Sequence, residues 1–160
     1  MGWYDTAQIC MNGHLINGSV KRYPDFCKSF CDQCGAKTIT TCPNCGHEIE
    51  GEYHVEGVIS VGGFEHAPAF CHNCGKAFPW TEARVKAAQE LAREVDGISE
   101  DEKALLEKSI GDLIKDGPNT TLAATRFKKI MSKAGKTAAG AFKDILVDVA
   151  SEAAKKMIWP

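Results

Sequence analysis

The second half of the chain lacks two residue types that are concentrated in the first half. No cysteine or histidine follows Trp80, whereas all eight cysteines and all five histidines precede Phe78. The chain also has no apolar run near the roughly 20 residues that a membrane-spanning helix needs. Its first residues carry neither the basic region nor the apolar stretch of a signal peptide. We therefore expect a cytoplasmic protein with no membrane partner, built from two parts of different chemistry.

The sequence also lacks the short motifs of the common enzyme classes. It has no phosphate-binding loop, no nucleophile elbow and no paired-carboxylate signature. Cys27 has no second cysteine at ligand spacing, and we interpret it as a bystander rather than a nucleophile or a ligand. The net charge of −2 gives no general reason to expect a nucleic acid or a membrane surface as partner. We therefore expect no enzymatic activity.

The first half contains four pairs of metal-ligand residues. Without an export signal, cysteines at such spacings indicate metal binding rather than disulfides. A Cys-x-x-Cys turn brings both sulfurs to one point, and a glycine directly after it permits the tight reversal of the backbone. The pairs are Cys10 with His14, Cys31 with Cys34, Cys42 with Cys45, and Cys71 with Cys74.

An internal repeat indicates how these pairs combine into two sites. The motif Phe30-Cys31-x-x-Cys34-Gly35 recurs forty residues later as Phe70-Cys71-x-x-Cys74-Gly75. Each copy has the form of the second half of a zinc ribbon, so each should combine with the pair that precedes it. A nested alternative joins the two middle pairs and leaves the outer pairs to find each other. The repeat favours Cys10, His14, Cys31 and Cys34 as site one, and Cys42, Cys45, Cys71 and Cys74 as site two.

Both predicted sites are filled by four protein ligands. A catalytic zinc normally keeps one position open for water or substrate, so closed sites indicate two structural Zn²⁺ ions per chain. Iron is an alternative for the four-cysteine site, because a tetrahedron of thiolates also suits iron. A region this small needs its metals in order to fold.

Short strands are predicted between the ligand pairs. The alternating residues Tyr53, Val55 and Ile59, with Val58 and Val61, indicate a β-hairpin within residues 51–69, with a turn at Gly62-Gly63. Residues 38–40 are predicted to form a short strand joining the two ribbons. The four remaining histidines are expected to be exposed or loosely hydrogen-bonded: His47, His54, His66 and His72.

The second half is predicted to form about four helices, giving an α+β fold with domains at residues 1–79 and 80–160. Apolar residues at helical spacing predict helices over residues 81–95, 100–114, 120–134 and 137–157. Ser99 and Glu102 have the spacing of a capping box at the start of the second helix. The last helix has an apolar face longer than so small a domain can cover, so we expect a homo-oligomer held by this C-terminal helix.

Residues 117–143 contain six basic residues and no acidic one. This basic face suits an anionic partner, either a nucleic acid or an acidic protein. A solvated face, or a complement to the acidic run from Glu90 to Glu107, is the interpretation that we favour. Four of these basic residues share one face of the third predicted helix or its end: Arg126, Lys129, Lys133 and Lys136.

The order of these motifs resembles that of a known family. The shared features are residues 4–10, Asn12-Gly13-His14, the two repeated Cys-x-x-Cys-Gly motifs, residues 38–45 and the ending Ile158-Trp159-Pro160. They resemble the bacterial family known as domain of unknown function 2321 over nearly the whole chain. The resemblance implies a bacterial cytoplasmic protein with a double zinc ribbon and a helical tail. We interpret the chain as a non-enzymatic zinc-binding interaction or adaptor protein with an unknown protein partner, and nucleic-acid binding by the third helix is the alternative.

Overall fold

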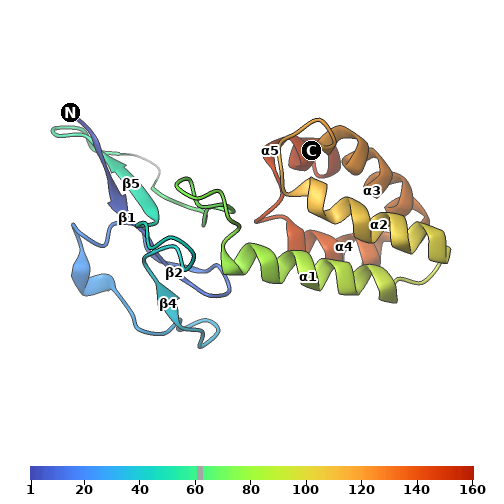
Figure 1. Cartoon of the computed structure of the whole chain (residues 1–160), viewed down its shortest axis with the longest axis horizontal. Helices are drawn as coiled ribbons and strands as arrows, with labels where there is room; N and C mark the ends of the chain where they lie inside the picture. The colour runs from blue at the N-terminus through green and yellow to red at the C-terminus, as the bar shows by residue number, and fades with distance from the viewer. Residues whose placement is uncertain (61–62) are drawn as a thin grey trace. The chain divides into compact units, whose positions relative to one another are not determined.

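The computed structural model describes residues 1–60 and 63–160. The chain divides into two compact units, Met1–Thr81 and Glu82–Pro160 (Figure 1). Short strands and the cysteine clusters occupy the first unit, and the second unit is helical. The predicted α+β fold, with a cysteine-rich strand region before a helical region, is therefore confirmed.

The first unit holds two small antiparallel sheets. In one sheet, β1 (Trp3–Thr6) pairs with β5 (Glu50–His54). In the other sheet, the central strand β2 (Gln8–Cys10) lies between β3 (Leu15–Asn17) and β4 (Thr38–Ile39). A single turn of 3₁₀-helix, η1 (Pro24–Phe26), lies between β3 and β4 in the sequence. The short strand predicted from residue 38 is thus confirmed as β4.

The hairpin predicted within residues 51–69 is wrong, because β5 pairs with the N-terminal strand. Glycine is needed at position 51, since a Cβ placed there would lie 2.9 Å from the carbonyl carbon of Thr6 in β1 and 2.2 Å from the carbonyl oxygen of Gly18. The amide of Glu52 donates to that same oxygen at 2.8 Å. No strand occurs in the described residues 55–60 and 63–69, and Val61 and Gly62 lie outside the described residues.

A small apolar core supports the first unit. Ile9, Ile49, Phe78 and Trp80 are almost fully buried together with Ala7. The rings of Phe78 and Trp80 stack with their centres 4.6 Å apart, and Trp80 Nε1 donates to the carbonyl oxygen of Pro68 at 2.8 Å. Cys42 and Cys71 belong to the same buried cluster, so the core packs directly against cysteine ligands.

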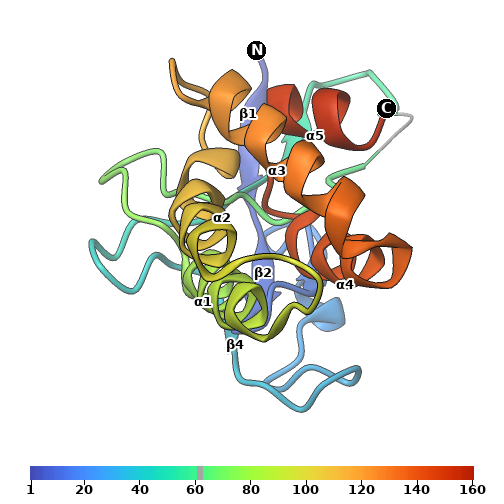
Figure 2. The ribbon, with the colours of Figure 1, turned by 90° about the vertical axis from the view of Figure 1, so that its right-hand side faces the viewer.

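The second unit contains five helices, in which α3 packs against α2, α4 and α5 (Figure 2). The predicted capping box is present, with Ser99 Oγ accepting from the Glu102 amide at 3.1 Å and the Glu102 carboxylate accepting from the Ser99 amide at 3.0 Å. Phe127 and Phe142 are buried in the core with their rings edge to face. No helix in the described residues is long and apolar enough to cross a membrane. The helices are α1 (Pro79–Glu94), α2 (Glu100–Leu113), α3 (Thr120–Ala134), α4 (Lys136–Leu146) and α5 (Glu152–Ile158).

The single helix predicted over residues 137–157 is wrong, because the chain turns between α4 and α5. Ser151 has an extended backbone, and its Oγ caps α5 by accepting from the Ala154 amide at 3.2 Å. Its own amide donates to the carbonyl oxygen of Leu113 at 2.9 Å. The break returns α5 to α3 and places the ring of Trp159 against that of Phe127, with centres 6.2 Å apart. Ala154 of α5 is therefore buried within the unit.

Candidate metal centres

Three of the four ligand turns have the same backbone geometry. In each, the amide of the first cysteine donates to the carbonyl oxygen of the residue five positions later, and the glycine amide donates to the carbonyl oxygen of the first cysteine, each bond measuring 2.8 Å. The glycines have φ between +72° and +75°, in the left-handed region, although a Cβ at these positions would meet nothing within 4 Å. Backbone conformation rather than space therefore requires glycine. These glycines are Gly35, Gly46 and Gly75.

The fourth turn differs and ends on imidazole. The Cys10 amide donates to the His14 carbonyl at 3.0 Å, and the Gly13 amide donates to the Cys10 carbonyl at 2.9 Å. Gly13 has φ of +88°, and a Cβ there would lie 3.0 Å from Trp80 Cβ. Glycine is thus required here by both conformation and space, and the turn is anchored against the core of the first unit.

The structure brings Cys10, His14, Cys31 and Cys34 into one cluster, with all ligand atoms within 4.8 Å of one another. The sulfurs of Cys10 and Cys34 are 3.8 Å apart, and His14 Nδ1 lies 3.5 Å from Cys10 Sγ and 3.6 Å from Cys31 Sγ. Zinc–sulfur bonds of about 2.3 Å and a zinc–nitrogen bond of about 2.0 Å in a tetrahedron require separations of about 3.8 Å and 3.5 Å. The spacing of these atoms therefore fits one tetrahedral ion, with His14 presenting Nδ1.

The second cluster contains Cys42, Cys45, Cys71 and Cys74, again with all sulfurs within 4.8 Å. The sulfurs of Cys42 and Cys74 are 3.8 Å apart, and those of Cys45 and Cys71 are 3.7 Å apart. A disulfide would bring two sulfurs to about 2.05 Å, and all of the cysteines are free thiols. Both clusters could hold a metal ion, and they follow the pairing that the internal repeat favoured.

Cys27 lies outside both clusters. Its sulfur accepts a hydrogen bond from Asn17 Nδ2 at 3.5 Å, and its side chain is half-buried beside η1. The same Asn17 amide donates to the carbonyl oxygen of Tyr23 at 2.8 Å. Cys27 is thereby held in a loop that does not approach either set of ligands.

Asparagine side chains connect the two turns of each cluster, one in site one and two in site two, and the sequence analysis did not identify them. Asn12 donates to Cys34 Sγ at 3.3 Å, which joins the two turns of site one. In site two the exchange is reciprocal, because Asn44 donates to Cys74 Sγ at 3.4 Å and Asn73 donates to Cys45 Sγ at 3.5 Å. The signal was the recurrence of asparagine directly before the second cysteine in residues 42–45 and 71–74. Such bonds orient the ligands and stabilise negative charge on sulfur.

Backbone amides around the clusters favour the thiolate form of two ligands. The Ala36 amide, assisted by Asn12, lowers the pKa of Cys34 to about 6. The Lys76 amide, assisted by Asn44, lowers the pKa of Cys74 to about 6. Burial raises the pKa of Cys10 instead. Because a divalent metal binds the thiolate form, Cys34 and Cys74 are prepared for metal at neutral pH.

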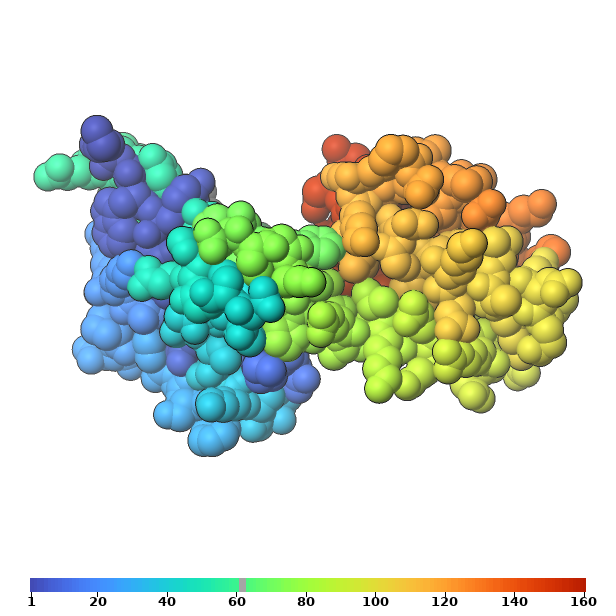
Figure 3. Space-filling view, viewed as in Figure 1, coloured from blue at the N-terminus to red at the C-terminus, as the bar shows by residue number. Residues whose placement is uncertain are grey.

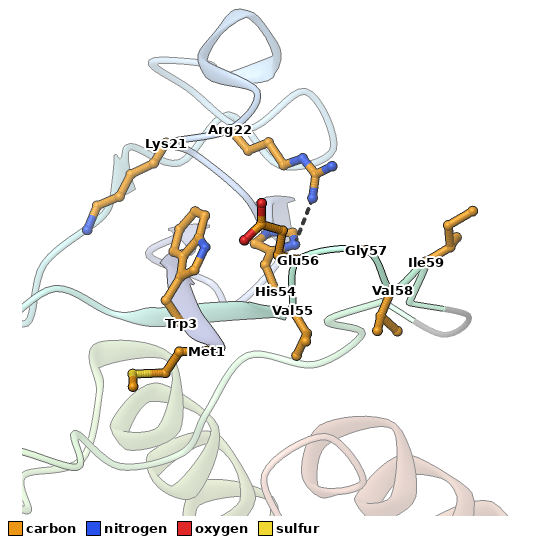
Figure 4. A pocket seen from close by; sticks show the side chains of 10 residues that line it. All are labelled: Met1, Trp3, Lys21, Arg22, His54, Val55, Glu56, Gly57, Val58 and Ile59. Carbon is orange, nitrogen blue, oxygen red and sulfur yellow. Dashed lines mark hydrogen bonds between the residues drawn. The ribbon is translucent and has the colours of Figure 1, made fainter.

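His54 was expected to be exposed or loosely hydrogen-bonded, but the structure buries it, with only 9% of its surface exposed. Arg22 Nη1 lies 3.1 Å from His54 Nδ1 (Figure 4). Since arginine stays protonated and donates, Nδ1 accepts and Nε2 carries the ring proton. Nε2 then donates to Ser19 Oγ at 3.2 Å, and the Ser19 hydroxyl donates to the Glu52 carboxylate at 2.6 Å. Ser19 is buried and directs its proton away from the imidazole, so this cluster ties β5 to the loop after β3.

The basic residues of α3, and Lys136 at the start of α4, have different surroundings. Lys133 forms an ion pair with Glu102 of α2, so one of the four charges is neutralised within the unit. Arg126, Lys129 and Lys136 form no ion pair or hydrogen bond with the described residues. The interpretation of the basic face as a complement to the acidic run thus applies to Lys133 alone.

Comparison with known proteins places the chain within a family. No curated protein and no solved structure matches the chain. A family model matches residues 3–158, which include both clusters and all five helices. The match covers nearly the whole chain, in agreement with the resemblance of its motifs. The chain belongs to the family described as an uncharacterised protein conserved in bacteria, domain of unknown function 2321.

Proposed function

We propose that the chain is a non-enzymatic adaptor protein whose first unit is held together by two structural zinc ions and binds a protein partner. The closed clusters support the structural part of this proposal. Each supplies four protein ligands and so leaves no position for substrate. Three sulfurs with one imidazole nitrogen, and four sulfurs, are both common ligand sets for structural zinc.

An exposed aromatic surface carries the interaction part of the proposal. Tyr4 and Tyr53 are 53% and 47% exposed on one face of the β1–β5 sheet. Tyr4 and Tyr53 are opposite each other across the sheet, with ring centres 4.7 Å apart. Figure 3 shows the first residues of the chain beside the segment that follows β5 at the surface of the first unit. Aromatic residues are enriched at protein interfaces, and an exposed cluster of them marks an interaction site.

The opposite side of the same sheet is hollowed. Trp3 and His54, which are also partners across the strands, line a depression of about 730 Å³ together with Arg22 and Val58 (Figure 4). A depression lined by a tryptophan and an arginine supplies the two residue types that most often anchor a partner. The metal clusters do not require these residues, so their exposure supports the proposal of an external partner.

The proposal is tested by measuring metal content and partner binding separately. Elemental analysis of protein purified from its bacterial host should give two zinc ions per chain. Partner capture should then be compared between the wild type, the double variant Tyr4→Ser/Tyr53→Ser and the control Phe26→Ser, which removes a 67% exposed aromatic side chain from η1. A partner lost only in the double variant supports the proposal, and one retained by all three contradicts it.

Nucleic-acid binding by α3 is the second candidate function. It is favoured by Arg126, Lys129 and Lys136, which carry positive charge and have no acidic partner in the described residues. Binding to phosphates must weaken as salt rises, with a slope that reports the number of contacts. Changing all three residues to glutamate should abolish DNA or RNA binding if this candidate is correct. No binding by the wild type at low salt would reject it.

We further propose that the protein acts in the cytoplasm. Seven cysteines supply ligands to the two clusters, and metal-binding thiols persist where the environment keeps them reduced. Fractionation of host cells, with zinc content measured on the recovered protein, tests this location. Recovery in an oxidising compartment with the ligand cysteines in disulfides would contradict it.

A further inference from the structure

The helical unit contains a pocket of about 450 Å³ that the proposed zinc sites and aromatic surface do not use. It lies where α3 ends and α4 begins, and the residues after α5 close one side. Its size is within the range of about 300–1,000 Å³ that is typical of sites for small ligands.

The walls of the pocket are mostly apolar and are supported by the core. Phe127 is 1% exposed and contacts both Phe142 and Trp159 edge to face. Met131, which is 7% exposed, and Ala139 of α4 complete this surface. A wall whose main residues are held by packing inside the unit is formed before any ligand arrives, which reduces the cost of binding.

Two positive charges border these apolar walls. Lys128 and Lys136 line the pocket, and neither forms an ion pair or hydrogen bond with the described residues. Other lysines of the unit do have acidic partners, as Lys133 has Glu102 and Lys155 has Glu152. No acidic residue lines the pocket. The pocket therefore combines an apolar interior with two uncompensated cations.

We propose that this pocket binds a small carboxylate carrying an apolar chain, such as a medium-chain fatty acid. The apolar chain would lie against Phe127, Met131 and Ala139, and the carboxylate would pair with Lys128 and Lys136. The two contributions are separable, because burial of each methylene strengthens binding by up to about fourfold while the charge pairing depends on salt. This site belongs to the helical unit and goes beyond the proposed function of the zinc unit.

Calorimetric titration of the full zinc-loaded chain with decanoate, decanol and decyltrimethylammonium tests the proposal. Decanoate should bind most tightly, octanoate more weakly by up to about sixteenfold, and decyltrimethylammonium least. Lys128→Gln/Lys136→Gln should weaken decanoate at least tenfold and leave decanol unchanged. The matched control Lys129→Gln/Lys143→Gln removes the same charge from exposed positions outside the pocket and should bind decanoate like the wild type.

A second variant tests the location of the apolar chain. Ala139→Phe fills the pocket and should abolish binding of both decanoate and decanol, while the helical circular dichroism signal confirms that the unit is folded. Absence of decanoate binding by the wild type overturns the proposal. Equal binding of decanoate and decyltrimethylammonium would also overturn it, because the pocket would not distinguish a carboxylate from a cation. An equal loss of affinity in the two lysine double variants would overturn it too, because the pocket lysines would have no specific role.

Discussion

Asn44 Nδ2 donates to Cys74 Sγ at 3.4 Å, so a side chain of one ligand turn stabilises the thiolate of the other. Asn44→Ala removes this donor without removing a ligand. We expect two metal ions per chain as before, with affinity at site two reduced by about 10–100-fold, as is typical for partners of metal ligands. Competition with a chromophoric chelator measures this change. Gln33→Ala is the control, because Gln33 has the same place in its turn and no hydrogen bond to the described residues; an equal loss there would contradict the role of Asn44.

Metal binding should depend on pH because the thiols of Cys34 and Cys74 have a pKa of about 6, below their ordinary value of 9.0. Because the pKa is lowered in the folded cluster, the thiolates stabilise the fold at pH values above the ordinary pKa of 9.0. This contribution is lost as pH falls through about 6. At pH 7 these two residues are already mostly thiolates, so zinc binding should release fewer protons than the number of cysteine ligands. At pH 5 Cys34 and Cys74 start mostly protonated, so the proton release should rise while affinity falls. Calorimetry in buffers of different ionisation enthalpy counts the protons, and a pH-independent count would contradict the prediction.

Replacing Cys74 by serine should unfold site two and leave the helices folded, because the binding energy of a structural metal is folding energy and the helices form a separate unit. Elemental analysis should show loss of one zinc ion per chain, with the helical circular dichroism signal retained. Cys27→Ser is the control and should keep both ions, since Cys27 lies outside both clusters. Metal loss in the control would show that the ligand assignment is wrong.

Ser151→Ala should destabilise the helical unit by about 1 kcal/mol, with a range of roughly 0.5–2 kcal/mol for loss of a helix cap. The Ser151 hydroxyl accepts from the Ala154 amide at the start of α5, and alanine cannot replace that acceptor. Chemical denaturation followed by helical circular dichroism measures the difference. Ser132→Ala, at an exposed position of α3, should change the stability by less than about 0.5 kcal/mol.

The proposed homo-oligomer can be tested on α5, because the segment predicted as one helix forms α4 and α5. Val149 is buried within the chain, so an aspartate there would unfold the unit rather than separate subunits. Ala153 on α5 is exposed, and Ala153→Glu places a charge on the same segment without disturbing the core. Light scattering should give a multiple of the 17.4 kDa chain mass for the wild type and a smaller value for Ala153→Glu. A wild-type monomer at high micromolar concentration would contradict assembly through this segment.

The features predicted correctly from sequence are those set by short-range chemistry. The left-handed glycines at 35, 46 and 75 and the capping box at Ser99 depend on a few neighbouring residues, so their signals lie within a few positions of each other. The helical periodicity of the second half likewise depends on one turn of helix and the next. Grouping the ligands needed more distant information, which the repeat of Phe30–Gly35 at Phe70–Gly75 supplied.

The features that were missed depend on partners far away in sequence. The partner of β5 is β1, more than forty residues earlier in the chain, and no local pattern of residues 51–69 reveals it. His54 is buried because Arg22 and Ser19 come from a loop more than thirty residues earlier. The break at Ser151 combines a local cap with a hydrogen bond to Leu113, and the apolar periodicity on either side concealed it.

The strand β5 lies inside the chain segment that site two closes, between Cys45 and Cys71, whereas β1 precedes every ligand of site one. During synthesis, all four ligands of site one have been made once Cys34 is added. Trp3 and Tyr4, in contrast, have no strand to pair with until residues 50–54 have been made. Site one can therefore acquire its metal while β1 is still unpaired, and the proposed interaction surface is completed only as the segment enclosed by site two is synthesised.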